Sequence, residues 1–565
     1  MLGYNIPAKG GGVRPWGHIT CDGTVANIEA MWSARNLRFY PLAVKAAILD
    51  DQSGGLQAAR SFEIATPDGG RARLADLDSW ALLNLDADAV LEIPARLENT
   101  FGIQPSAIDD AIGRFTPQQL GLAEFSQRFL GDVRGARVLV PGTKHYSHSK
   151  AVALLGLGAG SLLNVAVDRD ARQDLDDLQQ HLERCLADRH PVVSVTAVIG
   201  TTEESAIDPL EEILALRDVF AAKGLVFQVH ADAAWGGYHR SVINDPFDMP
   251  QPAGFVAGPP IQSALSAYSA RQLYALGKAD SITVDPHKSG YIPYPAGALC
   301  YRNGAMRDLV TFSAPVIYHG NAEPTVGIYG IEGSKPGAAA AAVYLSHRVI
   351  RPTRDGYGKI IGQALFSCRR LYARLLALAD PSDPFFVVPV PRLPAERLGK
   401  SAAEIEVERQ QVIALIDART NDEIRGNAAA MALLQEIGPD QNILSYAFNV
   451  RGNTDAALAN RLNKAIYGRL SIKPGADIYG SDMIVSTTDF VSNAYGPTFM
   501  GEFMSRLGLN AGQDAAVESI TVLRSVVMDP WVTEVGDISF TDVLGRELRK
   551  AVLESLADLR GVRGY

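Results

Sequence analysis

The sequence lacks the features of a secreted or membrane-bound protein. Its four cysteines lie far apart and form no Cys-x-x-Cys pair, and a chain of 565 residues needs no disulfides to fold, so we expect a reducing cytoplasm. No apolar run approaches the roughly 20 residues that span a bilayer, and the first residues contain no apolar signal core. We therefore expect neither export nor a membrane partner.

A basic excess is also absent. The chain carries 53 Lys+Arg against 63 Asp+Glu, a formal net charge of -10, which gives no large basic patch for a nucleic-acid backbone. We find neither internal repeats nor low-complexity segments. With 47% hydrophobic and 21% charged residues, the chain can fill several layers of core and is expected to be soluble, with two large domains.

Short β-branched runs alternate with longer helical stretches between residues 136 and 300. This alternation is the pattern of parallel strands joined by crossover helices. The strand candidates are residues 136–142, 161–168, 191–200, 225–232 and 280–286. Several are apolar throughout, as expected of strands that helices cover on both faces. The sequence therefore predicts an α/β fold with a buried, mainly parallel central sheet.

The character of the chain changes near residue 350. There the helical AAAAAVYLSHRV gives way to a long amphipathic pattern and then to the strand candidates NILSYAFNV and DMIVSTTDFV. We expect a large domain over residues 1–355 and a smaller α+β domain over residues 356–565. GLGAGS, at 156–161, follows a helix and precedes a strand, the reverse of a dinucleotide loop, and is interpreted as a helix C-cap.

Polar side chains directly follow several of these strands. In open α/β sheets, ligands bind beyond the carboxyl ends of the strands, so these residues are the candidates for a site. They are His145, Thr201 and Thr202, His230 and Asp232, and His287 and Lys288. The last pair belongs to SITVDPHKSGYIPY, an apolar run that ends on charged residues.

Pyridoxal phosphate would explain this set of residues. Lys288 has the amine for a Schiff base, and Asp232 would keep the pyridine nitrogen protonated, which makes the ring an electron sink. We expect His145 to stack on one face of the ring and the small Ala234 to lie on the other. Thr202 is expected to bond the ring oxygen.

The stretch DGTVAN, after a glycine turn, begins a strong helix pattern. Backbone N–H groups at a helix N-terminus are unpaired donors at the positive end of the helix dipole, and they suit a phosphate. The expected donors are Gly23, Thr24, Val25, Ala26 and Asn27.

Each of these features has a simpler interpretation when taken alone. An Asp after a strand is more often a helix cap, a Lys at a strand end is usually a surface residue, and DGTVAN suits a plain helix start. His145 and His148 have the spacing of a metal pair, but further ligands do not follow at the usual distances. Tyr238 and Tyr291 are interpreted as structural aromatics. The cofactor interpretation is favoured because the features occur together, in one sequential series.

A family resemblance supports the same interpretation. The residues that carry it are WGHITCDGTVANIEAMWSARN, WALLNLDADAVLEI, VPGTKHYSHSKA, GTTEESAIDPLEEILALRD, VHADAAWGGYHR, SITVDPHKSGYIPYPAG, YGIEGSKPGAAAAAV, TTDFVSNAYG and VLRSVVMDPW. In this order the sequence resembles the group II pyridoxal-phosphate-dependent amino-acid decarboxylases, and most closely the bacterial tyrosine decarboxylases.

The resemblance implies a fold-type I enzyme that uses pyridoxal phosphate and is active as a homodimer, with sites near the subunit interface. By position, Lys288 resembles the Schiff-base lysine, Asp232 the pyridinium partner and His145 the stacking histidine. His287 is similar to the histidine that precedes the family lysine. Tyr294 matches a tyrosine six residues after that lysine, so Tyr294 or His145 is expected to return a proton to the substrate α-carbon.

Three departures from the family bear on dimer stability, on full activity and on the substrate. The family has a substantial segment before the phosphate loop, whereas Trp16 lies close to Met1 here, and we expect a truncated or misplaced start. Ser289 stands where methionine is usual, and Val526 and Val527 replace smaller or hydroxylated residues. We expect decarboxylation of an aromatic, tyrosine-like L-amino acid. A glutamate or aspartate decarboxylase, an oxidative deaminase and a truncated non-catalytic paralogue remain alternatives.

Overall fold

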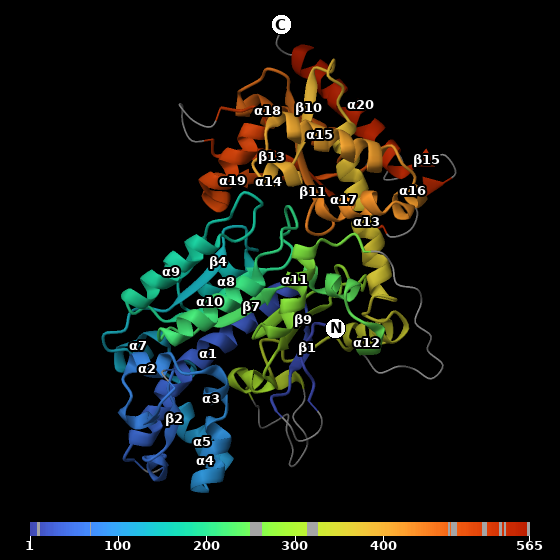
Figure 1. The fold of residues 1–565 in the computed structure, drawn as a ribbon. Helices are drawn as coiled ribbons and strands as arrows, with labels where there is room; N and C mark the ends of the chain where they lie inside the picture. The colour runs from blue at the N-terminus through green and yellow to red at the C-terminus, as the bar shows by residue number, and fades with distance from the viewer. Residues whose placement is uncertain are drawn as a thin grey trace.

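The computed structural model describes most of the chain. The described residues are 1–7, 12–52, 54–67, 69–248, 263–312, 326–472, 475, 483–510, 517–529, 534–535 and 538–561. Part of the N-terminal stretch and the last two residues of VLRSVVMDPW lie outside them. Figure 1 shows two regions along the chain, the first built from blue to green segments and the second from yellow to red ones.

The first region contains a seven-stranded sheet of order β1-β9-β8-β7-β6-β4-β5. Its strands are β1 (Trp16–Thr20), β4 (Arg137–Pro141), β5 (Leu162–Val165), β6 (Val192–Val198), β7 (Gln228–Asp232), β8 (Ser281–Val284) and β9 (Gly297–Tyr301). Neighbours from β5 to β8 are parallel, and β9 is antiparallel to both β8 and β1. The five predicted strands and the α/β class are confirmed, whereas β1 and β9 were not predicted.

Helices cover both faces of this sheet, and side chains of β4 and β6 alternate between two hydrophobic cores. Leu139 and Val195 lie in one core, and Val138, Val140 and Val193 lie in the other. This alternation explains why the strand sequences are apolar throughout. The helices are α1 (Gly23–Leu49) and α8 (Ser147–Leu154) on one side, and α9 (Leu175–Ala187), α10 (Leu210–Ala222) and α11 (Ala267–Ala275) on the other.

A group of short helices between β1 and β4 extends the core around α1. They are α2 (Ser79–Leu83), α3 (Ala87–Leu91), α4 (Ile93–Phe101), α5 (Pro105–Gly113), α6 (Pro117–Leu120) and α7 (Leu122–Phe129), with a hairpin of β2 (Glu63–Ala65) and β3 (Arg71–Arg73). They lie at the blue end of the molecule in Figure 1.

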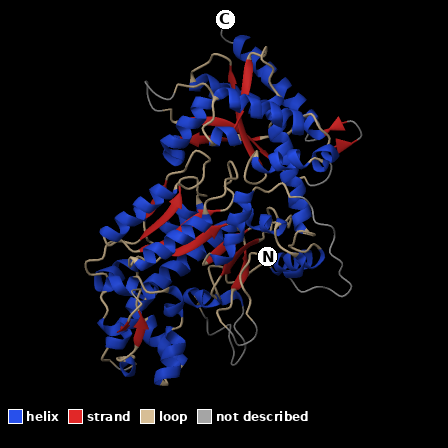
Figure 2. Cartoon of the chain, in the orientation of Figure 1, coloured by secondary structure: helices blue, strands red, loops and turns tan. Residues whose placement is uncertain are grey.

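The second region is built on a four-stranded antiparallel sheet of order β10-β11-β13-β12. Its strands are β10 (Phe385–Pro389), β11 (Ile443–Val450), β12 (Ser486–Val491) and β13 (Ser519–Val526), with a small hairpin of β14 (Glu534–Val535) and β15 (Ile538–Ser539). Two of these strands match the predicted candidates. Figure 2 shows the two sheets, in red, as separate groups of strands.

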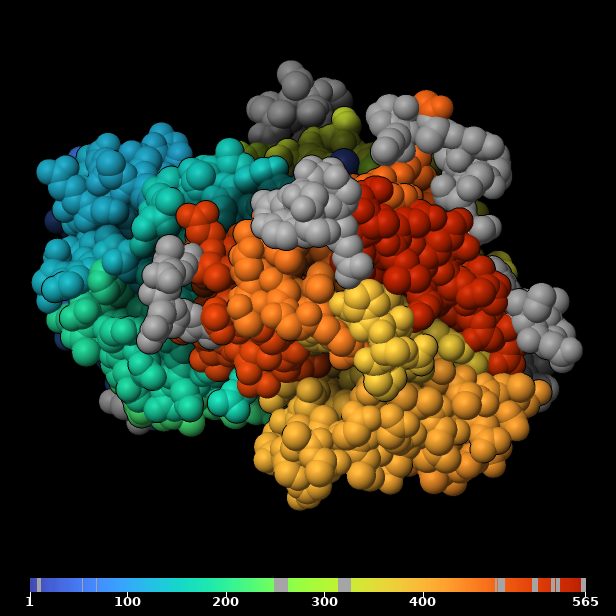
Figure 3. Space-filling model, turned by 90° about the horizontal axis from the view of Figure 1, so that it is seen from above, coloured from blue at the N-terminus to red at the C-terminus, as the bar shows by residue number. Residues whose placement is uncertain are grey.

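Helices surround this smaller sheet. They are α13 (Tyr357–Ala377), α14 (Pro394–Arg397), α15 (Ala402–Val412), α16 (Asn421–Gly426), α17 (Ala428–Glu436), α18 (Ala456–Arg469), α19 (Ser492–Arg506) and α20 (Phe540–Gly561), and α12 (Gly337–Val349) precedes them. The division between residues 355 and 356 stays a prediction, and α13 begins at Tyr357. Seen from above, the orange and red second region lies against the teal segments of the first (Figure 3).

Candidate functional site

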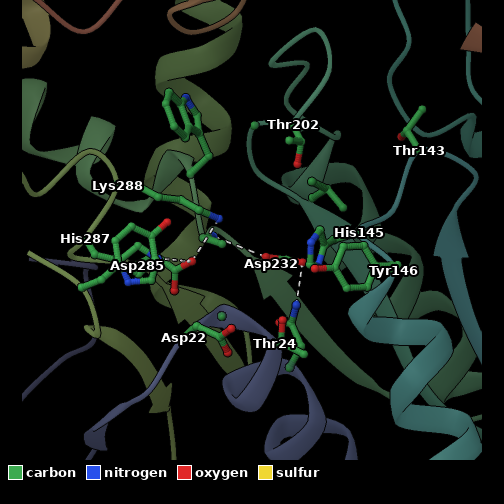
Figure 4. A pocket seen from close by; sticks show the side chains of 17 residues that line it. Asp22, Thr24, Thr143, His145, Tyr146, Thr202, Asp232, Asp285, His287 and Lys288 are labelled. Atoms are coloured by element: carbon green, nitrogen blue, oxygen red, sulfur yellow. Dashed lines mark hydrogen bonds and ion pairs between the residues drawn. The ribbon is translucent and has the colours of Figure 1, made fainter. Parts of the chain in front are cut away.

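A pocket of about 190 Å³ lies at the carboxyl ends of the central strands. Most of the candidate site residues line it; the exceptions are Val25, Ala26, Thr201 and His230. The lining also includes Asp22, Thr143, Tyr146, Val198, Gly200, Trp235 and Asp285. Figure 4 shows the side chains of Lys288, Asp232 and His145 directed into this space from different elements. The topology thus brings together residues that are far apart in the sequence.

Lys288 lies four residues after the end of β8 and pairs with Asp285. Its Nζ lies 3.0 Å from Asp285 Oδ2. Burial lowers the pKa of Lys288, but Asp285 and Asp232 outweigh burial and raise that pKa above its ordinary value. Burial also raises the pKa of Asp285, to about 6. Sequence reasoning missed Asp285 as a partner, although its place three residues before the lysine was a usable signal.

Asp232 ends β7 and is buried among hydrogen-bond donors. Its Oδ2 accepts from Asn27 Nδ2 at 2.8 Å and contacts His148 Nε2 at 3.1 Å, while the Ala234 N–H donates to Oδ1 at 3.3 Å. Burial alone would raise the pKa of Asp232, but the hydrogen bond and charge of His148 hold it well below its usual range. The carboxylate is therefore ionised. Sequence reasoning assigned neither Asn27 nor His148 to this role.

His145 precedes α8 and is half-buried at the side of the pocket. Its Nδ1 accepts from the Ser147 N–H at 3.3 Å and lies 3.0 Å from Ser147 Oγ. Its ring lies against Tyr146, with 4.0 Å between ring centroids. Burial lowers the pKa of His145, so the imidazole is neutral near pH 7.

The N-terminus of α1 presents fewer free donors than the five predicted. The Val25 N–H donates to Asp22 Oδ1 at 3.0 Å, and the Ala26 N–H donates to Asp22 O at 3.2 Å. Asn27 turns its amide toward Asp232. Asp22 caps the helix and so takes up the Val25 and Ala26 N–H groups, which corrects the prediction for these two donors. Gly23 and Thr24 remain at the pocket.

Gly23 has a steric reason to be glycine. A Cβ at this position would lie 2.8 Å from Asp285 Oδ2, which is closer than real Cβ contacts allow. The backbone of α1 therefore lies directly against the carboxylate of Asp285, which is the partner of Lys288. At Gly23 the wall of the pocket consists of backbone atoms.

Tyr294, Tyr146 and Thr202 lie at the opening of the pocket. Tyr294 is 70% exposed and stacks on His287, with 3.7 Å between ring centroids. His287 accepts from the Ala296 N–H at 3.3 Å, and burial lowers the pKa of His287 to about 4. Thr202 is also exposed, and Arg524 of β13 donates to its carbonyl at 2.6 Å. The predicted bond from Thr202 to a ring oxygen stays a prediction.

Tyr238 and Tyr291, which we interpreted as structural, have partners within the protein. Tyr238 is 1% exposed, and its hydroxyl lies 2.9 Å from His347 Nε2. Tyr291 donates to the carbonyl of Met528 at 2.7 Å. The interpretation of Tyr238 as a core residue is confirmed.

Comparisons with known proteins point to one family. The family model described as tyrosine decarboxylase, C-terminal, matches residues 413–555. The chain is 28% identical over 553 residues to the L-tyrosine decarboxylase of Enterococcus faecium, with 96% of this chain and 76% of that protein covered. It is 29% identical over 556 residues to the L-tyrosine decarboxylase of Levilactobacillus brevis, with 96% and 74% covered. The resemblance to the tyrosine decarboxylases is confirmed.

The tyrosine decarboxylase C-terminal match includes β11, β12 and β13 of the smaller sheet. Solved structures with lower sequence identity include mouse CSAD. It is 16% identical to this chain with a TM-score of 0.49, and the match covers 95% of this chain and 71% of the CSAD chain. Another is Oryza sativa TDC with PLP and tryptamine, which is 12% identical with a TM-score of 0.49 and covers 96% and 70%.

Proposed function

We propose that this protein is a pyridoxal-phosphate-dependent decarboxylase of an aromatic, tyrosine-like L-amino acid, which releases the amine and carbon dioxide. The observation that carries the proposal is that the Lys288 amine and the ionised carboxylate of Asp232 line the same pocket of about 190 Å³. The similarity to L-tyrosine decarboxylases over nearly the whole chain supports the same conclusion.

The residues of the pocket fit pyridoxal phosphate. Lys288 would hold its aldehyde, Asp232 its ring nitrogen, and the N-terminus of α1 at Gly23 and Thr24 its phosphate. Gly23 and Thr24 line the pocket together with Lys288 and Asp232, which is what a cofactor with an aldehyde, a ring nitrogen and a phosphate requires. When bound, the cofactor supplies an electron sink for the carbanion that remains after carbon dioxide leaves.

The chain's own groups then hold and move protons. Asp232 is ionised, so it can keep a hydrogen on a ring nitrogen placed against it. Lys288 must lose a proton to act as a nucleophile, and Asp285, 3.0 Å from its Nζ, can accept that proton. Tyr294 at the pocket opening is our candidate for returning a proton to the substrate α-carbon, and His145 is the second candidate.

The lining favours an aromatic over an acidic substrate. Tyr146, Trp235 and Tyr294 supply aromatic surface. Among the described residues that line the pocket, Lys288 is the single Lys or Arg, and it is committed to Asp285. A glutamate or aspartate side chain would therefore find no free cation to pair with its carboxylate.

A substrate panel tests this proposal. Purified protein with added pyridoxal phosphate is assayed against the common L-amino acids for carbon dioxide, amine, aldehyde and peroxide. We expect carbon dioxide and amine in equal amounts from an aromatic amino acid. Aldehyde with peroxide would indicate the oxidative deaminase, preference for glutamate or aspartate would overturn the aromatic assignment, and no product would favour the non-catalytic paralogue.

We further propose that the active form is a homodimer, and the surface of α12 supports it. Three of its apolar side chains are strongly exposed: Tyr344 at 63%, Leu345 at 61% and Val349 at 83%. Such a patch is costly in water and suits burial against a second copy. Light scattering should give twice the chain mass for the wild type and a monomer for Leu345→Glu. A monomeric wild type would overturn this proposal.

We also assign the protein to the cytoplasm, because its four cysteines are all free thiols. Cell fractionation checks this assignment, and recovery from an oxidising compartment would contradict it. In the part of the chain that the structure describes, no helix is long and apolar enough to cross a membrane.

A further inference from the structure

The buried amide of Asn27 is linked to two residues that we expect to contact the cofactor ring: to Asp232 directly and to His145 through Ser147. Asn27 is 2% exposed, and its Nδ2 donates to Asp232 Oδ2 at 2.8 Å and to Ser147 Oγ at 2.9 Å. Its Oδ1 lies 3.0 Å from His230 Nε2. Ser147 in turn lies 3.0 Å from Nδ1 of His145. One side chain of α1 thus connects β7 with the start of α8.

The chemistry of the partners fixes which way this amide faces. An ionised carboxylate can only accept hydrogen bonds, so the amide nitrogen of Asn27 must face Asp232. The amide oxygen then faces His230, and because that oxygen can only accept, His230 Nε2 must carry the hydrogen. Burial lowers the pKa of His230 to about 4, so the ring is neutral and Nδ1 is free to accept from Ser281 Oγ, 2.8 Å away.

The other arm of the network fixes the tautomer of His145. The Ser147 N–H can only donate, and it donates to His145 Nδ1. Ser147 Oγ accepts the second N–H of Asn27, which leaves the hydroxyl hydrogen directed at the same Nδ1. His145 Nδ1 is therefore unprotonated, and a neutral ring must carry its hydrogen on Nε2.

We propose that Asn27 is a positioning residue that holds Asp232 and, through Ser147, His145 in the orientations that cofactor binding and proton transfer need. This inference rests on the proposed function, and it concerns the side-chain amide of Asn27, whereas the sequence-based expectation concerned its backbone N–H. Asn27 acts here through Asp232 and His145 and needs no contact with the reacting atoms.

Asn27→Asp is the sharpest test because it keeps the shape of the side chain. When ionised, the new carboxylate donates nothing and faces Asp232, so both bonds are lost and the two charges repel. When protonated, its single O–H restores a bond to Asp232. Burial and Asp232 both raise the pKa of this new carboxyl, so the restored bond is present at low pH and is lost as pH rises.

The measurements are the Kd for pyridoxal phosphate, from quenching of protein fluorescence, and the pH profile of kcat/KM. We expect the Kd of Asn27→Asp to rise by about 10- to 100-fold at high pH and to approach that of the wild type at low pH. The ratio of variant to wild-type kcat/KM should fall as pH rises. A purely structural defect would instead lower this ratio equally at every pH.

Asn36→Asp is the matched control. Asn36 lies on the same helix, is 5% exposed and donates to the carbonyl of Leu309, outside the pocket. We expect its Kd to match the wild type and its kcat/KM ratio to be independent of pH. A wild-type Kd and a flat ratio for Asn27→Asp, or the same response from Asn36→Asp, would overturn the proposal.

Ser147→Ala keeps the inference testable if Asn27→Asp does not fold, as judged by near-ultraviolet circular dichroism. This variant removes the hydroxyl that links Asn27 to His145 and leaves the Asn27–Asp232 bond and the backbone N–H bond to His145 in place. We therefore expect a Kd within about 3-fold of the wild type and a kcat/KM about 10-fold lower. Unchanged kcat/KM would overturn the coupling. If the wild type binds no pyridoxal phosphate, the proposed function fails; if it binds and reacts but the variants do not respond, only the role of Asn27 fails.

Discussion

The floor of the pocket, which consists of Asp232, Asn27 and the Ser147 that supports them, differs from its mouth, which consists of Tyr294, Tyr146 and Thr202. The three floor residues are buried, and each has a hydrogen bond to another of them. Tyr294 and Tyr146 are 70% and 60% exposed. A rigid floor suits a cofactor that is the same in every turnover, because groups already held in place need no reorganisation during the reaction. The open mouth is where substrate choice can vary.

Lys288→Ala should have the largest effect, because Lys288 supplies the amine that would hold the cofactor. We expect activity below detection and loss of the absorbance of the covalently bound cofactor. Lys223→Ala is the control, since Lys223 is exposed at the end of α10, away from the pocket, and it should behave as the wild type. Full activity in Lys288→Ala would contradict the assignment of the site.

Asp232→Asn tests the electrostatic role of the floor. The amide has nearly the same shape but no charge, so it cannot stabilise a hydrogen on the ring nitrogen, and we expect kcat/KM to fall by about 100- to 1000-fold. The pH-dependent absorbance of the bound cofactor should change as well. Asp218→Asn removes an acid that is 76% exposed and should change neither quantity. Wild-type kcat/KM for Asp232→Asn would mean that this charge is not needed.

Tyr294→Phe tests the mouth without disturbing the floor. If Tyr294 donates the proton to the α-carbon, removing its hydroxyl should lower kcat by about 100-fold and leave the Kd for pyridoxal phosphate unchanged. Tyr274→Phe, at another exposed tyrosine, is the control. Unchanged kcat for Tyr294→Phe would move the proton-donor role to His145.

The sequence was sufficient to predict the central strands and the edge where the pocket lies. Five strands were predictable because each lies in a largely apolar run, and β4, β6, β7 and β8 are buried inside the sheet, whereas the edge strand β5 is only partly buried. Asp232 and Lys288 were found because they lie at the ends of such runs. The strands β1 and β9 were missed because WGHIT and GALCY are short and contain glycine and polar residues, and their pairing depends on distant partners.

The floor network was less predictable than its individual members. DGTVAN indicates a helix start, but nothing in its spacing tells whether Asn27 faces a phosphate or Asp232, which lies 205 positions away. That contact depends on how α1 packs against β7. His148 was weighed only as a metal ligand for the same reason, since its partner Asp232 is also remote in sequence.

The smallest effect is expected for a change in the loop that carries Thr202, at the mouth of the pocket. Thr202 is exposed, but the same loop contains a buried acid, Glu204, that anchors it. Glu204 is 4% exposed and accepts from the hydroxyl of Tyr495 on α19 at 2.8 Å. Burial raises the pKa of Glu204 to about 8, and Glu203 and Asp208 act in the same direction. In the unfolded chain a glutamate has a pKa of about 4.3.

Because the pKa of Glu204 is higher in the folded protein than in the unfolded chain, its protonated form stabilises the fold. This contribution to the free energy of unfolding is fully present below about pH 4.3 and is lost as pH rises through about 8. Glu204→Gln stays neutral and keeps an acceptor for Tyr495, so its melting temperature should fall less than that of the wild type between about pH 6 and about pH 9. Glu183→Gln, on the exposed face of α9, should follow the wild-type curve. Parallel curves for Glu204→Gln and the wild type would mean that Glu204 is already ionised in the folded protein, and that the mouth loop is held by Arg524 and its other contacts alone.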